Sequence, residues 1–226
     1  MSVLERFDEP ARRVMDLAWE EADRLRHDYV GPEHVLAGLA RQDGGRAAGV
    51  LRASGLGGEA VRAALDRLVA QGVLPGPWRN QADLLRTLGI DLGAVQQAVE
   101  TSFGSDAMRE ASRRALGRSR LREDRLICAS PLTGKAMAAK RAFHLAAREA
   151  DALRSGDISP EHLLLGVLRD ARDPAGTGLS RRGRRLGGYL GLPRGGPTPV
   201  RLIIEASGAS LDALRNEVRA QLATAS

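Results

Sequence analysis

Two short stretches of the chain place a glutamate and a histidine side by side directly after a proline. They are Pro32, Glu33 and His34 and, 128 positions further on, Pro160, Glu161 and His162. Carboxylates and imidazoles are metal ligands, so symmetric packing of the two stretches would give a cluster of two histidines and two glutamates. In the alternative arrangement, which we expect, each histidine hydrogen-bonds near the start of its own helix. We therefore predict no metal site.

Both stretches also have the pattern of a helix start. Gly31 and Ser159 stand at the N-cap, and the proline that follows each of them occupies the first helical position, where its missing N–H costs nothing. Glu33 and Glu161 then fall in the first turn, where the helix dipole favours a carboxylate. Capping alone would thus explain both glutamates, and a ligand-binding role is the second hypothesis.

The apolar residues that surround the first stretch recur every three or four positions, as in amphipathic helices. We expect helices over residues 8–25, 32–42, 46–53 and 59–69, with a short turn at 27–30. The stripe of the first helix recurs at the same offset of 128. Its members are Ala11, Val14, Ala18, Ala22 and Leu25 and then Ala139, Ala142, Ala146, Ala150 and Leu153. The first two helices are therefore duplicated.

A later helical pair occurs three times along the chain, at about residues 50–68, 84–103 and 203–222. Such a pair cannot cover its own apolar face, so we expect the extra pair, at about 82–103, to dock between or beside the two repeats. The expected division is a first repeat over 1–70, an inter-repeat segment with a basic linker over 71–130, and a second repeat over 131–226. A Gly- and Arg-rich insertion at about 170–199 is expected to be flexible.

The composition favours closely packed helices. The chain has 226 residues and a formal net charge of +6, and its 3% aromatic content leaves a core of mostly Ala, Leu and Val, which suits the packed helices of an all-α fold. No apolar run is long enough for a transmembrane helix, and the N-terminus lacks a signal-peptide pattern, so we expect a cytoplasmic protein without membrane contact. The single cysteine, Cys128, excludes a disulfide within the chain.

The sequence contains no complete catalytic or cofactor-binding motif. Gly134-Lys135 resembles the end of a phosphate-binding loop, but Ala136 replaces the Ser or Thr. Gly176-Thr177-Gly178 lacks the third glycine of a dinucleotide-binding loop. We therefore expect neither an enzyme nor a cofactor. The alternative function is nucleic-acid binding by the arginines of 109–125 and 181–185, but no aromatic stacking platform accompanies them.

These motifs together resemble a known family. The segments around Glu5-Arg6-Phe7, His27 to His34 and Leu36 to Leu39, and again around Ser159 to Gly166, are similar to the duplicated amino-terminal domain of class-C Clp AAA+ unfoldases. The resemblance implies an all-α fold of two four-helix repeats related by a pseudo-two-fold axis. It also implies a role in docking substrates and adaptors for a Clp protease, so proteins or peptides are the expected partners.

The resemblance further implies a binding site. In class-C members the glutamate of each motif receives the guanidinium of phosphorylated arginine, and Glu33 and Glu161 stand at these positions, each beside its histidine. Pro32 and Pro160 depart from the family pattern, because they replace a threonine and so remove a hydroxyl and an N–H. Leu4 stands where the family has a phenylalanine on a second binding surface, and Leu132 or Lys135 replaces the phenylalanine that opens the second repeat.

Overall fold

The fold is described from a computed structural model, which defines residues 3–27, 29–75, 101–102, 136–172 and 197–224. Most of the expected extra helical pair, the basic linker, Leu132 and most of the 170–199 insertion lie outside the described residues. Among the described residues the chain is overwhelmingly helical, which confirms the all-α prediction. None of the described helices is both long and apolar enough to cross a membrane.

The first half of the chain forms the four helices expected from its apolar spacing. A short 3-10 helix, η1 (Val3–Arg6), precedes α1 (Glu9–Arg24), α2 (Pro32–Arg41), α3 (Arg46–Ala53) and α4 (Gly58–Ala70). Asp8 caps α1 by accepting a hydrogen bond from the N–H of Ala11 at 2.7 Å. Gly55 ends α3 with a φ of 74°, the left-handed conformation that favours glycine after a helix.

The second half repeats this order with small differences. Its helices are α8 (Lys140–Ala152), α9 (Pro160–Ala171), α11 (Pro199–Ala206) and α12 (Leu211–Ala223). At an offset of 128, α9 starts in register with α2, whereas α8 starts three residues later than α1. Arg26 and Arg154, also 128 apart, both follow their helix with a positive φ, of 56° and 57°. The duplicated pattern therefore corresponds to duplicated local structure.

Short strands join the two halves, where the sequence indicated only a turn. β1 (Tyr29–Val30) pairs in parallel with β2 (Ala136–Met137). An equivalent single bridge joins Phe7 to Ile158. The expectation of a plain turn at 27–30 was therefore wrong, because the partner strand is more than one hundred residues away. This pairing gives partners to backbone groups that the packing of the halves removes from water.

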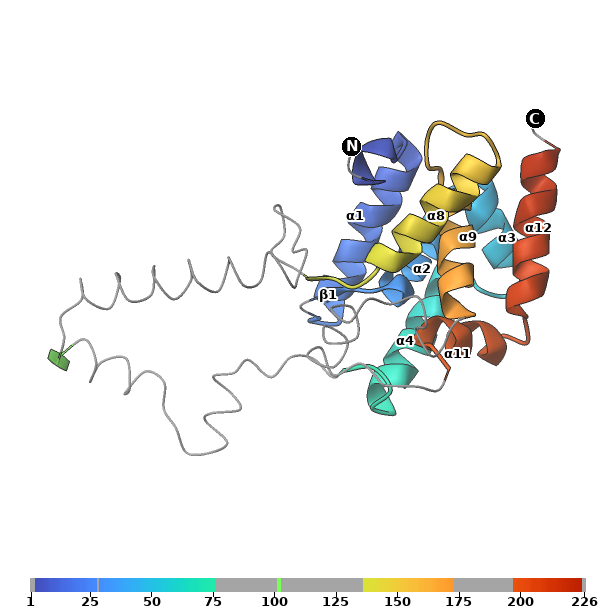
Figure 1. Ribbon diagram of the computed structural model, residues 1–226. Coiled ribbons are helices and arrows are strands. Elements are labelled where there is room, and N and C mark those ends of the chain that lie inside the picture. Colours follow the sequence, from blue (N-terminus) through green and yellow to red (C-terminus); the bar gives the residue numbers. More distant parts are fainter. Residues whose placement is uncertain (1–2, 28, 76–100, 103–135, 173–196, 225–226) are drawn as a thin grey trace.

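The helices of the two halves interleave around one core. α1 packs on α2 and α8 packs on α9, while α2 and α9 contact each other at the centre. The later helices cross over, because α11 contacts α2 and α4 and, reciprocally, α3 contacts α9 and α12. Figure 1 shows α1 and α12 at the two sides of this body, with α8 and α9 between them. These exchanged contacts are those of a pseudo-two-fold arrangement. The domain boundaries at 70 and 130 stay a prediction.

A glycine lets each central helix approach its partner closely. A Cβ at Gly38 of α2 would collide with the backbone oxygen of Val14 in α1. A Cβ at Gly166 of α9 would collide with that of Ala142 in α8. Both pairs of residues are related by the offset of 128. The glycines of the repeated stretches are thus explained by helix packing.

Each half also contains a buried glutamate surrounded by arginines. Glu21 of α1 accepts hydrogen bonds from Arg24 at 2.7 Å and from Arg62 of α4 at 2.9 Å. Its counterpart Glu149 of α8 accepts them from Arg169 of α9 and Arg219 of α12, at 3.0 and 2.6 Å. These ion pairs tie the first helix of each half to its later helices, and they give buried carboxylates the partners they need.

Candidate functional site

The first Pro-Glu-His stretch opens α2 as predicted, with Gly31 at the N-cap and Pro32 at the first helical position. The Glu33 side chain folds back against Gly31, whose missing Cβ leaves the space that the carboxyl occupies. The backbone N–H of Gly31 donates to Nδ1 of His34 at 2.9 Å. The histidine therefore hydrogen-bonds at its own helix start, as expected, and satisfies one of the free N–H groups there.

Behind Glu33 lies a buried group of rings. Nε2 of His34 is 2.9 Å from Nδ1 of His27, and Nε2 of His27 is 2.9 Å from the carbonyl oxygen of Pro75. The Tyr29 ring stacks on His27, with centroids 5.1 Å apart and planes within 8° of each other. All three rings are fully buried. These rings lie beside Glu33 at the start of α2, and Tyr29 interacts with its carboxyl.

The Glu33 carboxyl is 3% exposed, and no cation pairs with it among the described residues. Burial raises its pKa to about 7, against the lowering effect of its own backbone N–H and of the Tyr29 hydroxyl. Asp170 of α9 adds a like charge and raises the pKa further. Neither Oε1 of Glu33 nor the Tyr29 hydroxyl makes a hydrogen bond of good geometry within the described residues.

The second stretch opens α9 in the same way, with Ser159 at the N-cap and Pro160 after it. The N–H of Ser159 donates to Nδ1 of His162 at 3.1 Å, and burial lowers the pKa of that imidazole. The Ser159 hydroxyl, which has no counterpart at Gly31, donates to Glu161 Oε2 at 2.7 Å. Across the interface, Nε of Arg46 lies 3.7 Å from Glu161 Oε1. Unlike Glu33, Glu161 therefore has both a hydroxyl and a cation beside it.

The two glutamates lie at opposite ends of the central helix pair. Glu33 at the start of α2 interacts with Asp170 near the end of α9, whereas Glu161 stands at the start of α9 and interacts with Asp8. Nine residues of helix separate Glu161 from Asp170, which corresponds to about 14 Å. No group of three or more metal-ligating side chains is found among the described residues. The two Pro-Glu-His stretches therefore lie apart, and their histidines and glutamates do not come together in one cluster.

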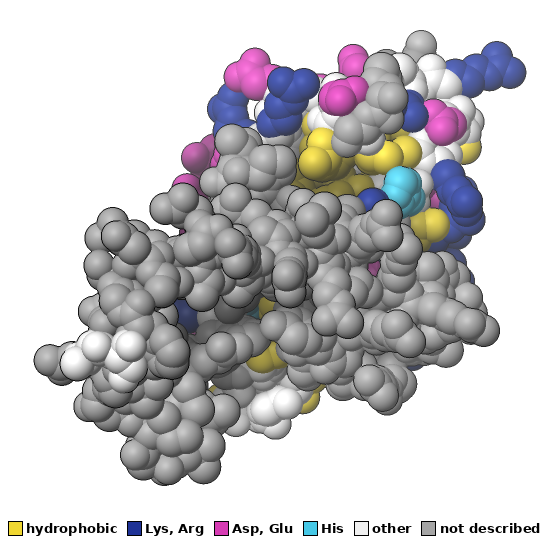
Figure 2. All heavy atoms as spheres, turned by 60° about the vertical axis from the view of Figure 1, so that its left-hand side comes forward, with side chains coloured by type: hydrophobic (Ala, Val, Ile, Leu, Met, Phe, Trp, Pro, Cys, Tyr) yellow, Lys and Arg dark blue, Asp and Glu magenta, His cyan; other side chains and the backbone are white. Residues whose placement is uncertain are grey.

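The remaining predicted partner residues differ in accessibility. Pro160 is buried and Pro32 is partly buried, each packed as the first residue of its helix. Leu4 of η1 is 43% exposed, and Figure 2 shows hydrophobic side chains open to solvent among charged ones on one face of the molecule. Leu132 lies outside the described residues. Exposure of Leu4 is compatible with its predicted role in partner binding, which stays a prediction.

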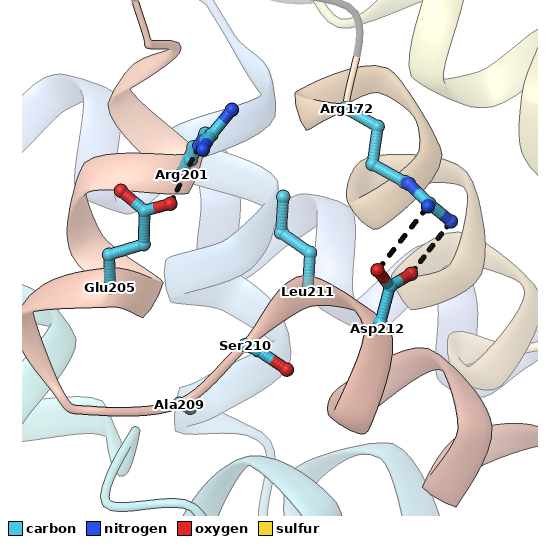
Figure 3. Close-up of a pocket in the computed structure, with 7 residues that line it drawn as sticks. All are labelled: Arg172, Arg201, Glu205, Ala209, Ser210, Leu211 and Asp212. Carbon is cyan, nitrogen blue, oxygen red and sulfur yellow. Dashed lines mark hydrogen bonds and ion pairs between the residues drawn. The ribbon is translucent and has the colours of Figure 1, made fainter.

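A hollow of about 330 Å³ between α9, α11 and α12 is lined by charged side chains (Figure 3). Arg172 pairs with Asp212 at 2.8 Å, and Arg201 pairs with Glu205 at 2.7 Å. Each arginine is thus neutralised by an acid on the wall of the same hollow. The hollow therefore provides little attraction for an anionic ligand such as a nucleic-acid phosphate.

Three residues that contribute to the two sites were missed in the sequence analysis: His27, Tyr29 and Arg46. His27 and Tyr29 lie in a segment interpreted as a turn, although a histidine and a tyrosine in a chain so poor in aromatics were a usable signal. Arg46 lies at the start of α3, 115 residues from Glu161. No sequence signal connects that pair, because only the crossing of the two halves brings it together.

Several known proteins are similar to this chain in sequence. Residues 6–75 match the family model of the Clp repeat (R) N-terminal domain. "Negative regulator of genetic competence ClpC/MecB" of Bacillus subtilis (strain 168) is 46% identical over 67 residues, 30% of this chain and 8% of the relative. "Probable ATP-dependent Clp protease ATP-binding subunit" of Chlamydia pneumoniae is 40% identical over 169 residues, 75% of this chain and 14% of the relative.

A similar structure is the N-terminal domain of ClpD from Arabidopsis thaliana, with a TM-score of 0.49 and 17% identity over 97% of this chain and 99% of that one. The sequence matches identify a Clp N-terminal domain in this chain, and the described residues are mostly helical. Its residues 6–75 form a Clp repeat (R) N-terminal domain, which confirms the resemblance based on the Pro-Glu-His motif. The chain spans only 8% and 14% of the length of the two curated relatives.

Proposed function

We propose that the chain is a non-catalytic docking domain that binds proteins or peptides, either substrates or adaptors of a Clp unfoldase. One relative is named as an ATP-binding subunit of a Clp protease, which supports a partner in that system. Within this role, we propose that Glu33 and Glu161 receive the guanidinium of arginine-phosphorylated proteins. The proposed compartment is the cytoplasm.

One observation carries this proposal: the chain presents a nearly buried carboxylate at the start of each central helix. Glu33 and Glu161 are 3% and 6% exposed, at the first turns of α2 and α9. A carboxylate in a sheltered position pairs strongly with a guanidinium, because the two groups form parallel charge-assisted hydrogen bonds. The adjacent helix N-terminus favours a phosphate. The guanidinium of phosphorylated arginine therefore has a carboxylate partner at both helix starts, and the helix dipole there favours the charge of the phosphate.

The prolines limit the phosphate contacts that the sites can make. Pro32 and Pro160 offer neither a hydroxyl nor an N–H, so the phosphate must be bound by other donors. The His34 and His162 imidazoles are already engaged by the N-cap N–H groups, so we assign them a positioning role. Leu4 and Leu132 are proposed as apolar contacts for the rest of a protein partner.

Calorimetric titration of the whole chain with phosphoarginine, and with an arginine-phosphorylated protein, tests the proposal. We expect heat from the wild-type protein, less heat from Glu33→Gln and Glu161→Gln, and the wild-type response from Glu217→Gln, an exposed glutamate on α12. No heat from the wild type, or equal heat from all variants, would exclude phosphoarginine as the ligand. Affinity capture from cell extract then shows whether Clp components bind the chain by another route.

A further inference from the structure

Arg46 gives the Glu161 site a cation that comes from the other half of the chain. It is the first residue of α3, and its Nε lies 3.7 Å from Glu161 Oε1. The same guanidinium donates to the backbone oxygen of Gln221 in α12 at 3.4 Å. Arg46 is therefore held between α3, α9 and α12, with its charge next to the carboxylate.

The Glu33 site has a proline where the Glu161 site has this arginine. The first residue of α11, which corresponds to the first residue of α3, is Pro199. Within the part of the chain that the structure describes, Asp170 places a like charge near Glu33, and Asp170 itself pairs with Arg141 at 3.3 Å. The two repeated glutamates thus differ in their surroundings: one stands beside a cation and the other beside an acid.

In phosphorylated arginine the phosphoryl group is bonded to a nitrogen of the guanidinium. A site that binds both groups needs a carboxylate for the first and a cation for the second, a few ångströms apart. Glu161 and Arg46 have this arrangement, and the prolines leave few other donors for the phosphoryl oxygens. Given the proposed function, we infer that Arg46 binds the phosphoryl group at Glu161, which makes this the phosphate-selective site of the two.

The geometry of Arg46 also favours a ligand-binding role over a closed internal ion pair. No hydrogen bond joins Arg46 to Glu161 at 3.7 Å, and the Arg46 side chain is 47% exposed. A guanidinium carries five N–H donors, and the contact to Gln221 uses one of them. The solvent-exposed donors can therefore contact a phosphoryl group while Glu161 keeps its hydrogen bond from Ser159.

The test compares phosphoarginine with free arginine as ligands of the whole chain. We expect Arg46→Gln to weaken phosphoarginine binding roughly 10-fold, because a charge-assisted hydrogen bond is lost, and to leave arginine binding unchanged. Arg46→Lys should keep part of the preference. Arg52→Gln is the matched control. Arg52 is an exposed arginine on the same helix, and its guanidinium donates to the backbone oxygen of Gln42 rather than to Glu161. Glu161→Gln should weaken both ligands.

The outcomes separate this inference from the proposed function. If Arg46→Gln tightens the binding of both ligands, Arg46 is an internal competitor and the inference is wrong. If Arg46→Gln and Arg52→Gln both bind phosphoarginine as the wild type does, the inference is wrong while the proposed function stands. If the wild type does not prefer phosphoarginine over arginine, then the phosphoarginine part of the proposed function and the inference fall together.

Discussion

The Nε2 atom of His34 lies 2.9 Å from the Nδ1 atom of His27 in the interior of the first half. A backbone N–H can only donate, so the bond from Gly31 makes Nδ1 of His34 an acceptor. Nε2 of His34 then carries the proton and donates to His27, and Nε2 of His27 donates to the carbonyl of Pro75. This chain of hydrogen bonds needs both imidazoles neutral, and it links the start of α2 to the segment after α4.

Replacement of His27 should therefore destabilise the fold. His27→Phe keeps a ring of similar size but leaves the Nε2–H of His34 and the carbonyl of Pro75 without a buried partner. We expect the free energy of unfolding to fall by about 2 kcal/mol. Urea denaturation measures this change, and the exposed His144→Ala serves as the control. Equal urea midpoints for His27→Phe and the wild type would contradict the hydrogen-bond chain.

Glu33 should make stability depend on pH in an unusual direction. Burial raises the pKa of its carboxyl to about 7, above its ordinary value of 4.5, so between these pH values the folded state holds a proton that the unfolded state has released. Its contribution to stability is therefore lost as pH rises from about 4.5 to 7, by on the order of 3 kcal/mol. Glu33→Gln removes this loss, so its stability relative to the wild type should increase over the same range.

The measurement is urea denaturation of the wild type and Glu33→Gln at several values between pH 4.5 and pH 8. Glu217→Gln, an exposed glutamate, controls for the general effect of removing one acid. A constant difference between Glu33→Gln and the wild type across this range would show that Glu33 titrates normally in the folded state.

Glu149 should make the stability of the fold depend on pH in the opposite direction. Burial by itself would raise the pKa of its carboxyl, but the hydrogen bond and charge of Arg219, together with Arg169 and Arg215, hold the pKa below its ordinary value. Its contribution is present above the unfolded pKa and is lost as pH falls through the folded pKa. Glu149→Gln should cost about 2–3 kcal/mol at pH 7, because it leaves the arginines without their acid.

Acid titration of stability checks this expectation. The difference in the free energy of unfolding between the wild type and Glu149→Gln should become smaller as pH is lowered towards 3, because the wild-type carboxyl then becomes protonated as well. A gap that stays constant, or that widens in acid, would contradict the role of the arginines around Glu149.

Gly38 and Gly49 offer a test of the close approach of α1 and α2. A methyl group at Gly38 meets the backbone oxygen of Val14, which cannot move without shifting α1, whereas a methyl group at Gly49 of α3 meets nothing within 4 Å. We expect Gly38→Ala to destabilise the protein by about 2 kcal/mol or more. Gly49→Ala should stabilise it by about 0.5–1 kcal/mol, because alanine is the better helix former. Thermal melts of both variants decide between these outcomes.

Much of the local structure was determined by the sequence alone. The period of the apolar residues and the Gly-Pro and Ser-Pro starts predict α1 to α4 and their counterparts, because a helix end depends on residues within one turn. The offset of 128 predicted the duplication, and the repeated Pro-Glu-His motif led to the two candidate sites and to the family. The histidines bond at their own helix starts for the same local reason.

Only the tertiary structure decided how these elements combine. The strand at Tyr29–Val30, the arginines around Glu149 and the contact of Arg46 with Glu161 all join residues that lie far apart in the chain. The two stretches already differ in sequence at Gly31 and Ser159, but only the packing of the halves brings Arg46 to Glu161. Burial and neighbouring charge set the ionisation of a carboxyl, and both are properties of the packed chain that no local pattern of residues contains.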